Sequence, residues 1–189
     1  MDVYDAIRGR STAGDLTPEV PPREAIARLI DAAIWAPNHH LTEPWRFTVL
    51  AGAERETFGR ALADWLQGGG DGETPGEDDV RRARRSMMGA PVTVVVTQAA
   101  GADDDPVREL EDYAACCCAV QNLMLAAQAD GLASKWMTGR ISRYAGAKQI
   151  LRLDPRDRIV GFVCIGYAAP GAEVAERQRL PARVTWRGW

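Results

Sequence analysis

The chain has 189 residues, of which 46% are hydrophobic and 26% charged, as is typical of one soluble globular domain. Its formal net charge of −3 gives no general attraction to nucleic acid or to a membrane surface. No stretch approaches the roughly 20 apolar residues that span a bilayer, and the start, MDVYDAIRGRST, lacks the apolar core of a signal peptide. We therefore expect a cytoplasmic protein with neither nucleic acid nor membrane as a partner.

Two helices, a strand and a loop are predicted in the first part of the chain. Pro22 can open a helix, apolar residues then recur at helical spacing, and Pro37 ends the helix near residue 36. RFTVLAG (46–52) alternates like a strand. The apolar residues of the second helix are Phe58, Leu62, Trp65 and Leu66. This helix ends in GGGDGETPGEDD (68–79), which has no apolar residue and predicts a loop.

The second part of the chain predicts two buried strands around a long helix. PVTVVVT (91–97) and IVGFVCIGYA (159–168) are nearly continuous apolar runs. A helix is expected from 107 to about 130, and short elements at 135–138 and 142–151 follow it. The expected apolar stripe of this helix is Leu110, Tyr113, Ala114, Cys117, Val120, Gln121, Met124 and Leu125. A few strands among several helices indicate an α+β fold rather than a repeated βαβ alternation. We expect a single domain over 1–189.

The four cysteines do not form a recognised motif. Three are consecutive, Cys116 to Cys118, and the fourth is Cys164. On a helix, consecutive thiols point about 100° apart and cannot converge on one metal ion. We expect them to be small apolar fillers of a protein in a reducing compartment.

The sequence also lacks a Rossmann fingerprint and a P-loop, so any nucleotide is held in another way.

Both histidines of the chain lie in APNHHLTEPWRF (36–47). Adjacent histidines rarely bind one ion, and Glu43 would have to supply a third ligand from the same loop, so we expect no metal site. A catalytic triad would need a nucleophile, and no G-x-S-x-G motif is present. Histidines that cap the helix end or bind backbone are the plain structural alternative.

The whole stretch resembles a segment of the nitroreductase family, A-P-S-x-x-N-x-Q-P-W-x-F, and is closest to a short subgroup with A-P-D-H-K-x-x-Q-P-W-R-F. Three further regions resemble the family in the same order. RGRST (8–12) is similar to its N-terminal R-R-S element, and 111–139 to its central helix and tryptophan turn. IVGFVCIGY (159–167) and then RQRLP (177–181) are similar to its last core strand and tail.

The resemblance implies an α/β/α sandwich with a mostly antiparallel central sheet and a C-terminal tail that crosses to a partner subunit. It also implies a homodimer with flavin mononucleotide (FMN) at the subunit interface. Hydride would pass from NADH or NADPH, through the flavin, to a small electron-poor acceptor (a nitroaromatic, a quinone or an activated alkene) by a ping-pong mechanism. No side chain is then catalytic, because flavin N5 carries the chemistry.

The expected FMN contacts fall in four segments of the chain. They are Arg10, Ser11, Thr12, Asn38, His39, Glu43, Trp136, Met137, Thr138, Arg177 and Arg179. Arginine forks and backbone donors suit a phosphate, so the N-terminal segment and the tail are expected to bind that group. By resemblance, the loop would line the ribityl and pyrimidine parts, and the tryptophan turn would run along the isoalloxazine.

The sequence departs from the family pattern in two places. Leu41 and Glu43 stand where the family usually has Asn and Gln. An anionic Glu43 beside reduced flavin is unfavourable, so we expect Glu43 to be either protonated or paired, for instance with Arg46 or Arg10.

The N-terminal element often continues to a basic residue near flavin N1, where this chain has Ala13 and Gly14. Lys135 or Arg8 is a candidate replacement. Three alternatives stay open: an FMN-binding dehydrogenase, a non-catalytic flavin-binding or sequestering module of the same fold, and an interaction protein with no cofactor.

Overall fold

The computed structural model describes residues 1–68, 78, 81, 85, 88–102, 105–139, 142–143, 145–171 and 184–188. The expected loop at 68–79 lies outside the described residues, apart from its first residue and Asp78. Among the helices of the described residues, none has the length and apolar character needed to cross a membrane.

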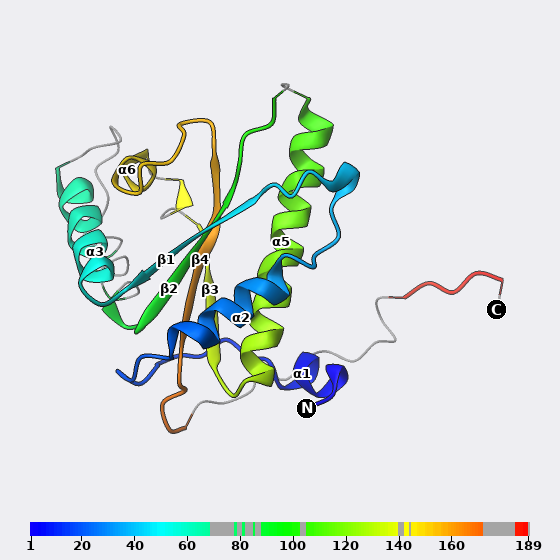
Figure 1. The fold of residues 1–189 in the computed structure, drawn as a ribbon, viewed down its shortest axis with the longest axis horizontal. Helices are drawn as coiled ribbons and strands as arrows, with labels where there is room; N and C mark the ends of the chain where they lie inside the picture. Colours follow the sequence, from blue (N-terminus) through cyan, green and yellow to red (C-terminus); the bar gives the residue numbers. More distant parts are fainter. Residues whose placement is uncertain are drawn as a thin grey trace.

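The structure has helices on both faces of one antiparallel sheet. In chain order the elements are α1 (Val3–Gly9), α2 (Arg23–Ala33), the 3-10 turn η1 (His39–Leu41), β1 (Trp45–Ala51), α3 (Gly52–Gln67), β2 (Val92–Gln98), α5 (Pro106–Ala129), β3 (Ala133–Met137), α6 (Ala145–Ile150) and β4 (Arg158–Gly166). The four strands pair in the order β1-β2-β4-β3, each pair antiparallel. Helices α2 and α5 cover one face, and α3 and α6 the other (Figure 1). The predicted α+β sandwich with an antiparallel sheet is confirmed.

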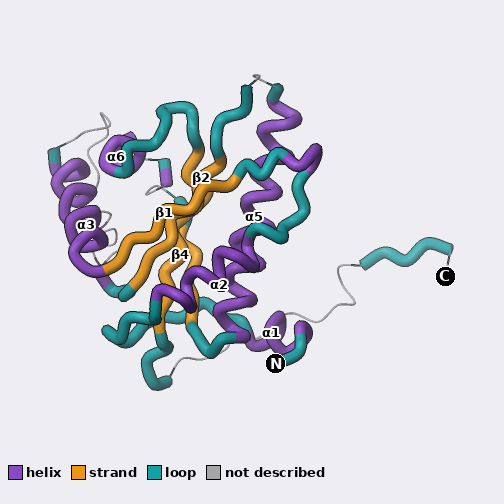
Figure 2. Tube along the Cα trace, viewed as in Figure 1, coloured by secondary structure: helices purple, strands orange, loops and turns teal. Residues whose placement is uncertain are grey.

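The two central strands divide the core into two layers. All seven residues of β2 are buried, as are all residues of β4 after Arg158. Successive side chains of a strand point to opposite faces, so Val94 packs in the α2/α5 layer and Val95 in the α3/α6 layer. In the second layer the rings of Phe58 and Phe162 lie 5.9 Å apart, centroid to centroid. The tube view in Figure 2 shows the strands between these helices.

Helix α5 matches the predicted range of 107 to about 130, but its buried face differs from the predicted stripe. The Asp105 side chain caps it by accepting from Val107 N at 2.9 Å. The residues that it buries are largely small: Asp112, Ala115, Cys116, Ala119, Val120, Leu123, Met124 and Ala127. The expected stripe also included Leu110, Ala114 and Gln121, which are exposed, Leu110 by 66%. That part of the prediction was wrong.

The cysteines take three different environments. Cys116 and Cys164 are buried, Cys117 is half-buried, and Cys118 is exposed on the outer side of α5. Burial raises the pKa of the Cys116 thiol to about 12, and the nearby Cys117 and Asp112 add to this effect. The thiol therefore stays protonated and unreactive near neutral pH. The filler role expected from the sequence applies to the two buried cysteines and not to Cys118.

Two helix predictions need correction. Helix α2 begins at Arg23, with Pro22 as its N-cap residue, and ends at Ala33 rather than near residue 36. Helix α1 was not predicted at all. It buries only Ala6 and leaves Tyr4 exposed, so its sequence carries no core-facing pattern.

Candidate functional site

The N-terminal segment lies against the outer edge of the sheet. After α1, Thr12 forms a parallel bridge with Ser134 of β3, and Ala13 N donates to the Ser134 carbonyl at 3.2 Å. Strand β3 is an edge strand, so this contact occupies its free side. Arg10, Ser11 and Thr12 are thereby brought to the first half of the strand that carries Trp136 and Met137.

A cavity of about 790 Å³ lies at the other end of β3. Its described lining is Tyr113, Trp136, Thr138, Gly139, Ser142, Arg143, Arg158, Ile159 and Val160. We call it the β3 cavity. Two of the expected site residues, Trp136 and Thr138, line it. Met137 points to the opposite face of the sheet, where it is buried with Phe162 and Cys164, so its side chain does not reach this cavity.

The Trp136 ring depends on a glycine in the neighbouring strand. A Cβ atom on Gly161 would lie 2.1 Å from Trp136 Nε1 and 2.8 Å from the Met137 carbonyl oxygen. Real Cβ contacts are never this short, so only glycine at 161 leaves room for the ring. Trp136 Nε1 is buried and has no hydrogen-bond partner among the described residues.

Gly161→Ala is expected to lower the free energy of unfolding by about 3 kcal/mol, because the added methyl group overpacks the space between β3 and β4. Urea unfolding of the cofactor-free protein measures this change. Gly14→Ala is the matched control, since nothing lies within 4 Å of a Cβ atom at that position. Equal stability of the two variants would contradict the role assigned to Gly161.

The loop with both histidines is fastened to the first half of α5. His39 Nδ1 lies 2.8 Å from Glu111 Oε2, and Thr42 Oγ1 donates to Asp112 Oδ1 at 2.6 Å. Within the loop, Glu43 N donates to Asn38 Oδ1 at 3.0 Å. These contacts fix the loop backbone in one conformation.

That backbone conformation is strained. His40, Leu41 and Glu43 have φ angles of 55°, 53° and 43°, in the left-handed region that side chains with a Cβ atom disfavour. Asn tolerates this region better than Leu, which gives a physical reason for the Asn usual in the family at the position of Leu41. Arg46 donates to the main-chain carbonyl of Glu43 at 3.0 Å. Among the residues that the structure describes, Arg46 forms no ion pair with the Glu43 carboxylate, so the suggested pairing stays a prediction.

The loop and the β3 cavity lie on different sides of α5. Glu111 contacts the loop and Tyr113 lines the cavity, and residues two apart on a helix project about 200° from each other. Within one chain, the N-terminal segment lies against β3, which itself carries Trp136 and Met137. Asn38, His39 and Glu43 lie on the other side of α5. Arg177 and Arg179 lie outside the described residues.

A smaller cavity of about 120 Å³ borders the N-terminal segment. Lys135 lines it together with Ala13 and Gly14. Arg8, the other candidate for the missing basic residue, is on α1, with its Cζ atom 5.8 Å from the centre of the Tyr4 ring. Of the two candidates, Lys135 is the one beside Ala13 and Gly14.

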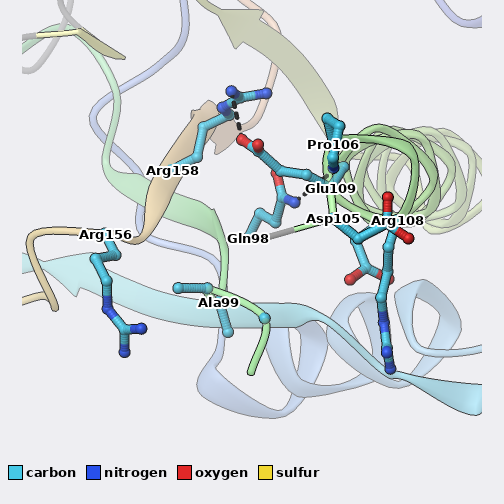
Figure 3. A pocket seen from close by; sticks show the side chains of 11 residues that line it. Gln98, Ala99, Asp105, Pro106, Arg108, Glu109, Arg156 and Arg158 are labelled. Carbon is cyan, nitrogen blue, oxygen red and sulfur yellow. Dashed lines mark hydrogen bonds and ion pairs between the residues drawn. The ribbon is translucent and has the colours of Figure 1, made fainter. Parts of the chain in front are cut away.

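Arg158 lines both the β3 cavity and a neighbouring hollow of about 210 Å³, whose lining residues are drawn in Figure 3. Its Nη2 atom lies 2.7 Å from Glu109 Oε1, and its Cζ atom 5.4 Å from the centre of the Tyr113 ring. Gln98 is buried in the hollow, where its Nε2 atom donates to the Glu109 carbonyl at 2.8 Å. Burial, followed by the nearby Cys117, raises the pKa of the Tyr113 hydroxyl.

Sequence reasoning missed Tyr113, Arg143 and Arg158 as residues of the cavity. They come from α5, the segment after β3 and the start of β4, and no short motif links them. Among the residues that the structure describes, no three His, Cys, Asp or Glu side chains are grouped as metal ligands.

Comparison with known proteins gives one consistent answer. Residues 7–167 match the Nitroreductase family. The Escherichia coli K12 protein named "Putative NAD(P)H nitroreductase YdjA" is 26% identical over 166 residues, 88% of each chain. The crystal structure of a nitroreductase-like family protein from Bacillus cereus has a TM-score of 0.83 at 25% identity and covers 100% of this chain and 97% of its own. A "putative nitroreductase in complex with fmn" from Desulfovibrio desulfuricans has a TM-score of 0.78 at 27% identity, with 100% and 98% covered.

Proposed function

The chain belongs to the nitroreductase family, and we propose that it is an FMN-dependent oxidoreductase. In this proposal it transfers hydride from NADH or NADPH to a small electron-poor molecule such as a nitroaromatic, a quinone or an activated alkene. The observation that carries the proposal is strand β3, which has the segment Arg10 to Thr12 bridged to its first half and the β3 cavity at its other end.

The described residues fit such a cofactor. Strand β3 has five residues and so spans roughly 17 Å, a length suited to an elongated molecule with a phosphate at one end and a flat ring at the other. Arg10, Ser11 and the backbone around them offer donors for the phosphate. Trp136 offers an aromatic wall for the ring, and Thr138 a hydroxyl beside it. The FMN bound by the relative from Desulfovibrio desulfuricans supports this assignment.

FMN, when bound, supplies the hydride-transfer chemistry. The chain's own residues then bind and orient. Arg10 anchors the phosphate, Trp136 limits the position of the ring, and the open side of the cavity admits the nicotinamide and the acceptor in turn. A single shared space of this kind leads to ping-pong kinetics, and no side chain is required to move a proton.

We further propose a homodimer in which 1–189 forms one domain and the tail crosses to the partner. Helix α5 leaves Val107 and Leu110 exposed, and the neighbouring loop and turn leave Leu41 and Trp35 exposed by 81% and 80%. Exposed apolar side chains in such number mark an interaction surface. The described tail, 184–188, extends away from the sheet and helices (Figure 1), as a crossing segment would.

The dimer also explains why the expected site residues are divided within one chain. Asn38, His39 and Glu43 lie on the far side of α5 from the β3 cavity of their own chain. In the proposed dimer these three residues reach the β3 cavity of the other subunit and line the ribityl and pyrimidine parts of its FMN. Arg177 and Arg179 of the tail remain proposed phosphate ligands.

Initial-rate kinetics test the oxidoreductase proposal. The rate of NADPH or NADH oxidation is measured against several fixed concentrations of a quinone, and parallel double-reciprocal lines are expected. Intersecting lines would contradict the shared binding space. If neither nucleotide is oxidised by FMN-loaded protein, the alternatives of an FMN-binding dehydrogenase or a sequestering module gain support.

Lys135→Ala is expected to lower the midpoint potential of the bound flavin by roughly 20–40 mV, equivalent to about 1–2 kcal/mol for two electrons. Lys135 shares the face of β3 that Met137 occupies, opposite Trp136, so its charge acts on the proposed ring position across the strand. A positive charge there favours the reduced flavin, which carries more negative charge. The potential is measured by equilibration with a redox dye. Arg8→Ala, which removes an arginine on α1, should leave the potential unchanged. An unchanged potential in Lys135→Ala would rule out Lys135 as the replacement charge.

A further inference from the structure

We propose that the outer end of the β3 cavity is a subsite for an anionic group, a phosphate or a carboxylate, held by Arg143 and Arg158. The proposal rests on the function given above, because the anionic group belongs to a molecule that reacts at the flavin. It adds a class of substrate that the family membership does not specify.

Within one chain, the described charged groups of the cavity wall are of one sign. Its described lining contains two guanidinium groups and no carboxylate, together with the hydroxyls of Tyr113 and Ser142. The chain as a whole has a formal net charge of −3, so the sign at the cavity is opposite to that of the protein. Such a local field raises the concentration of oppositely charged ligands at the site.

Arg158 is held in place by its neighbours. Glu109 lies on one side at 2.7 Å and the Tyr113 ring lies below the guanidinium, and Figure 3 shows the Arg158 side chain turned toward Glu109 and away from Arg156. A guanidinium has five N–H donors, and the contact with Glu109 joins one of its nitrogens, Nη2. Arg158 is therefore pre-positioned and retains donors for a second anion.

Arg143 stands at the rim of the same cavity. Just before it, Ser142 donates both its N–H and its hydroxyl to the Gly139 carbonyl, at 3.2 and 2.8 Å. Arg143 is exposed and forms no ion pair with any residue that the structure describes. Arg156 is also exposed, but it pairs with Asp154 at 3.4 Å and lines the neighbouring hollow rather than the β3 cavity.

A guanidinium pair of this kind suits planar carboxylates and phosphates, which accept two parallel hydrogen bonds from one arginine. Two molecules that enter the cavity can carry such a group. One is the nicotinamide nucleotide, through the additional phosphate that distinguishes NADPH from NADH. The other is an acceptor that carries a carboxylate on its ring.

Calorimetric titration of the FMN-loaded protein tests the subsite and separates these two sources. The probes are 4-nitrobenzoate against the uncharged 4-nitrobenzamide, and NADP⁺ against NAD⁺. In Arg143→Gln/Arg158→Gln, the Kd of 4-nitrobenzoate or of NADP⁺ is expected to rise about tenfold or more, since charge-assisted hydrogen bonds are lost. The Kd of its counterpart, 4-nitrobenzamide or NAD⁺, should change less than about twofold, because these probes do not use the subsite.

Two further variants keep the result interpretable. Arg156→Gln removes an arginine outside the cavity and should leave all four affinities unchanged. Arg143→Gln alone removes only an exposed side chain, so it is expected to fold and to show part of the effect even if the double variant does not fold.

The proposal is overturned if neither anionic probe binds more weakly, or if the double variant loses affinity for FMN itself. The second result would mean that these arginines hold the cofactor phosphate. Failure of the wild-type protein to bind FMN would instead overturn the proposed function, and FMN affinity is measured first for that reason.

Discussion

Replacing Ala114 with arginine is expected to convert the proposed dimer into monomers and to lower FMN affinity at least about a hundredfold, because an unpaired charge buried in an interface costs roughly 3–5 kcal/mol. Ala114 lies on the outer side of α5, one turn from the exposed Leu110 and Cys118. The new side chain would extend into the apolar surface that the dimer covers. FMN affinity is expected to fall with it, because in the proposed dimer the partner's loop completes each site.

Analytical ultracentrifugation and FMN titration by fluorescence quenching measure the two effects on the same samples. Ala53→Arg is the control, since Ala53 is exposed on α3, on the opposite face of the sheet. A dimeric Ala114→Arg protein would exclude this face of α5 from the interface. A monomer that still binds FMN tightly would show that one chain suffices for the cofactor site.

Arg10→Ala is expected to weaken FMN binding about 10- to 100-fold while leaving the fold and the dimer intact, because a hydrogen bond to a charged group contributes roughly 1.5–3 kcal/mol. Arg10 is half-buried, and its N–H closes α1 by donating to the Ala6 carbonyl at 3.0 Å. The substitution keeps this main-chain contact and removes only the guanidinium.

The control for this experiment is two residues away. Arg8 is in the last turn of α1, and its side chain lies over the Tyr4 ring, so Arg8→Ala should bind FMN as the wild type does. Riboflavin gives a second control, since it lacks the phosphate and should bind both proteins equally. An Arg10→Ala protein with unchanged FMN affinity would move the phosphate site away from the N-terminal segment.

The regular elements were predictable where burial is strong. Strands β2 and β4 are buried on both faces and read as continuous apolar runs, and α5 carries clear start and stop signals in Asp105 and Gly131. The buried face of α5 was misread because small residues such as Ala115 and Ala119 approach the sheet, while the larger Leu110 is exposed.

The candidate site was predictable only in part. Contiguous segments such as Arg10 to Thr12 could be recognised by resemblance, and the structure places this segment on β3. Tyr113, Arg143 and Arg158 come together only through the fold, and each is an ordinary residue in its own segment. The left-handed backbone of Leu41 was also not predictable, because a leucine gives no local signal for positive φ.

The measurement that tests the central claim most directly is the visible spectrum of the purified protein under anaerobic conditions, before and after addition of NADPH and then NADH. An oxidised-flavin spectrum that bleaches with either nucleotide is the predicted result and establishes the first half of the proposed reaction. A flavin spectrum that persists with both would contradict the reductase assignment. Protein that shows no flavin, even after incubation with FMN, would contradict the cofactor site itself.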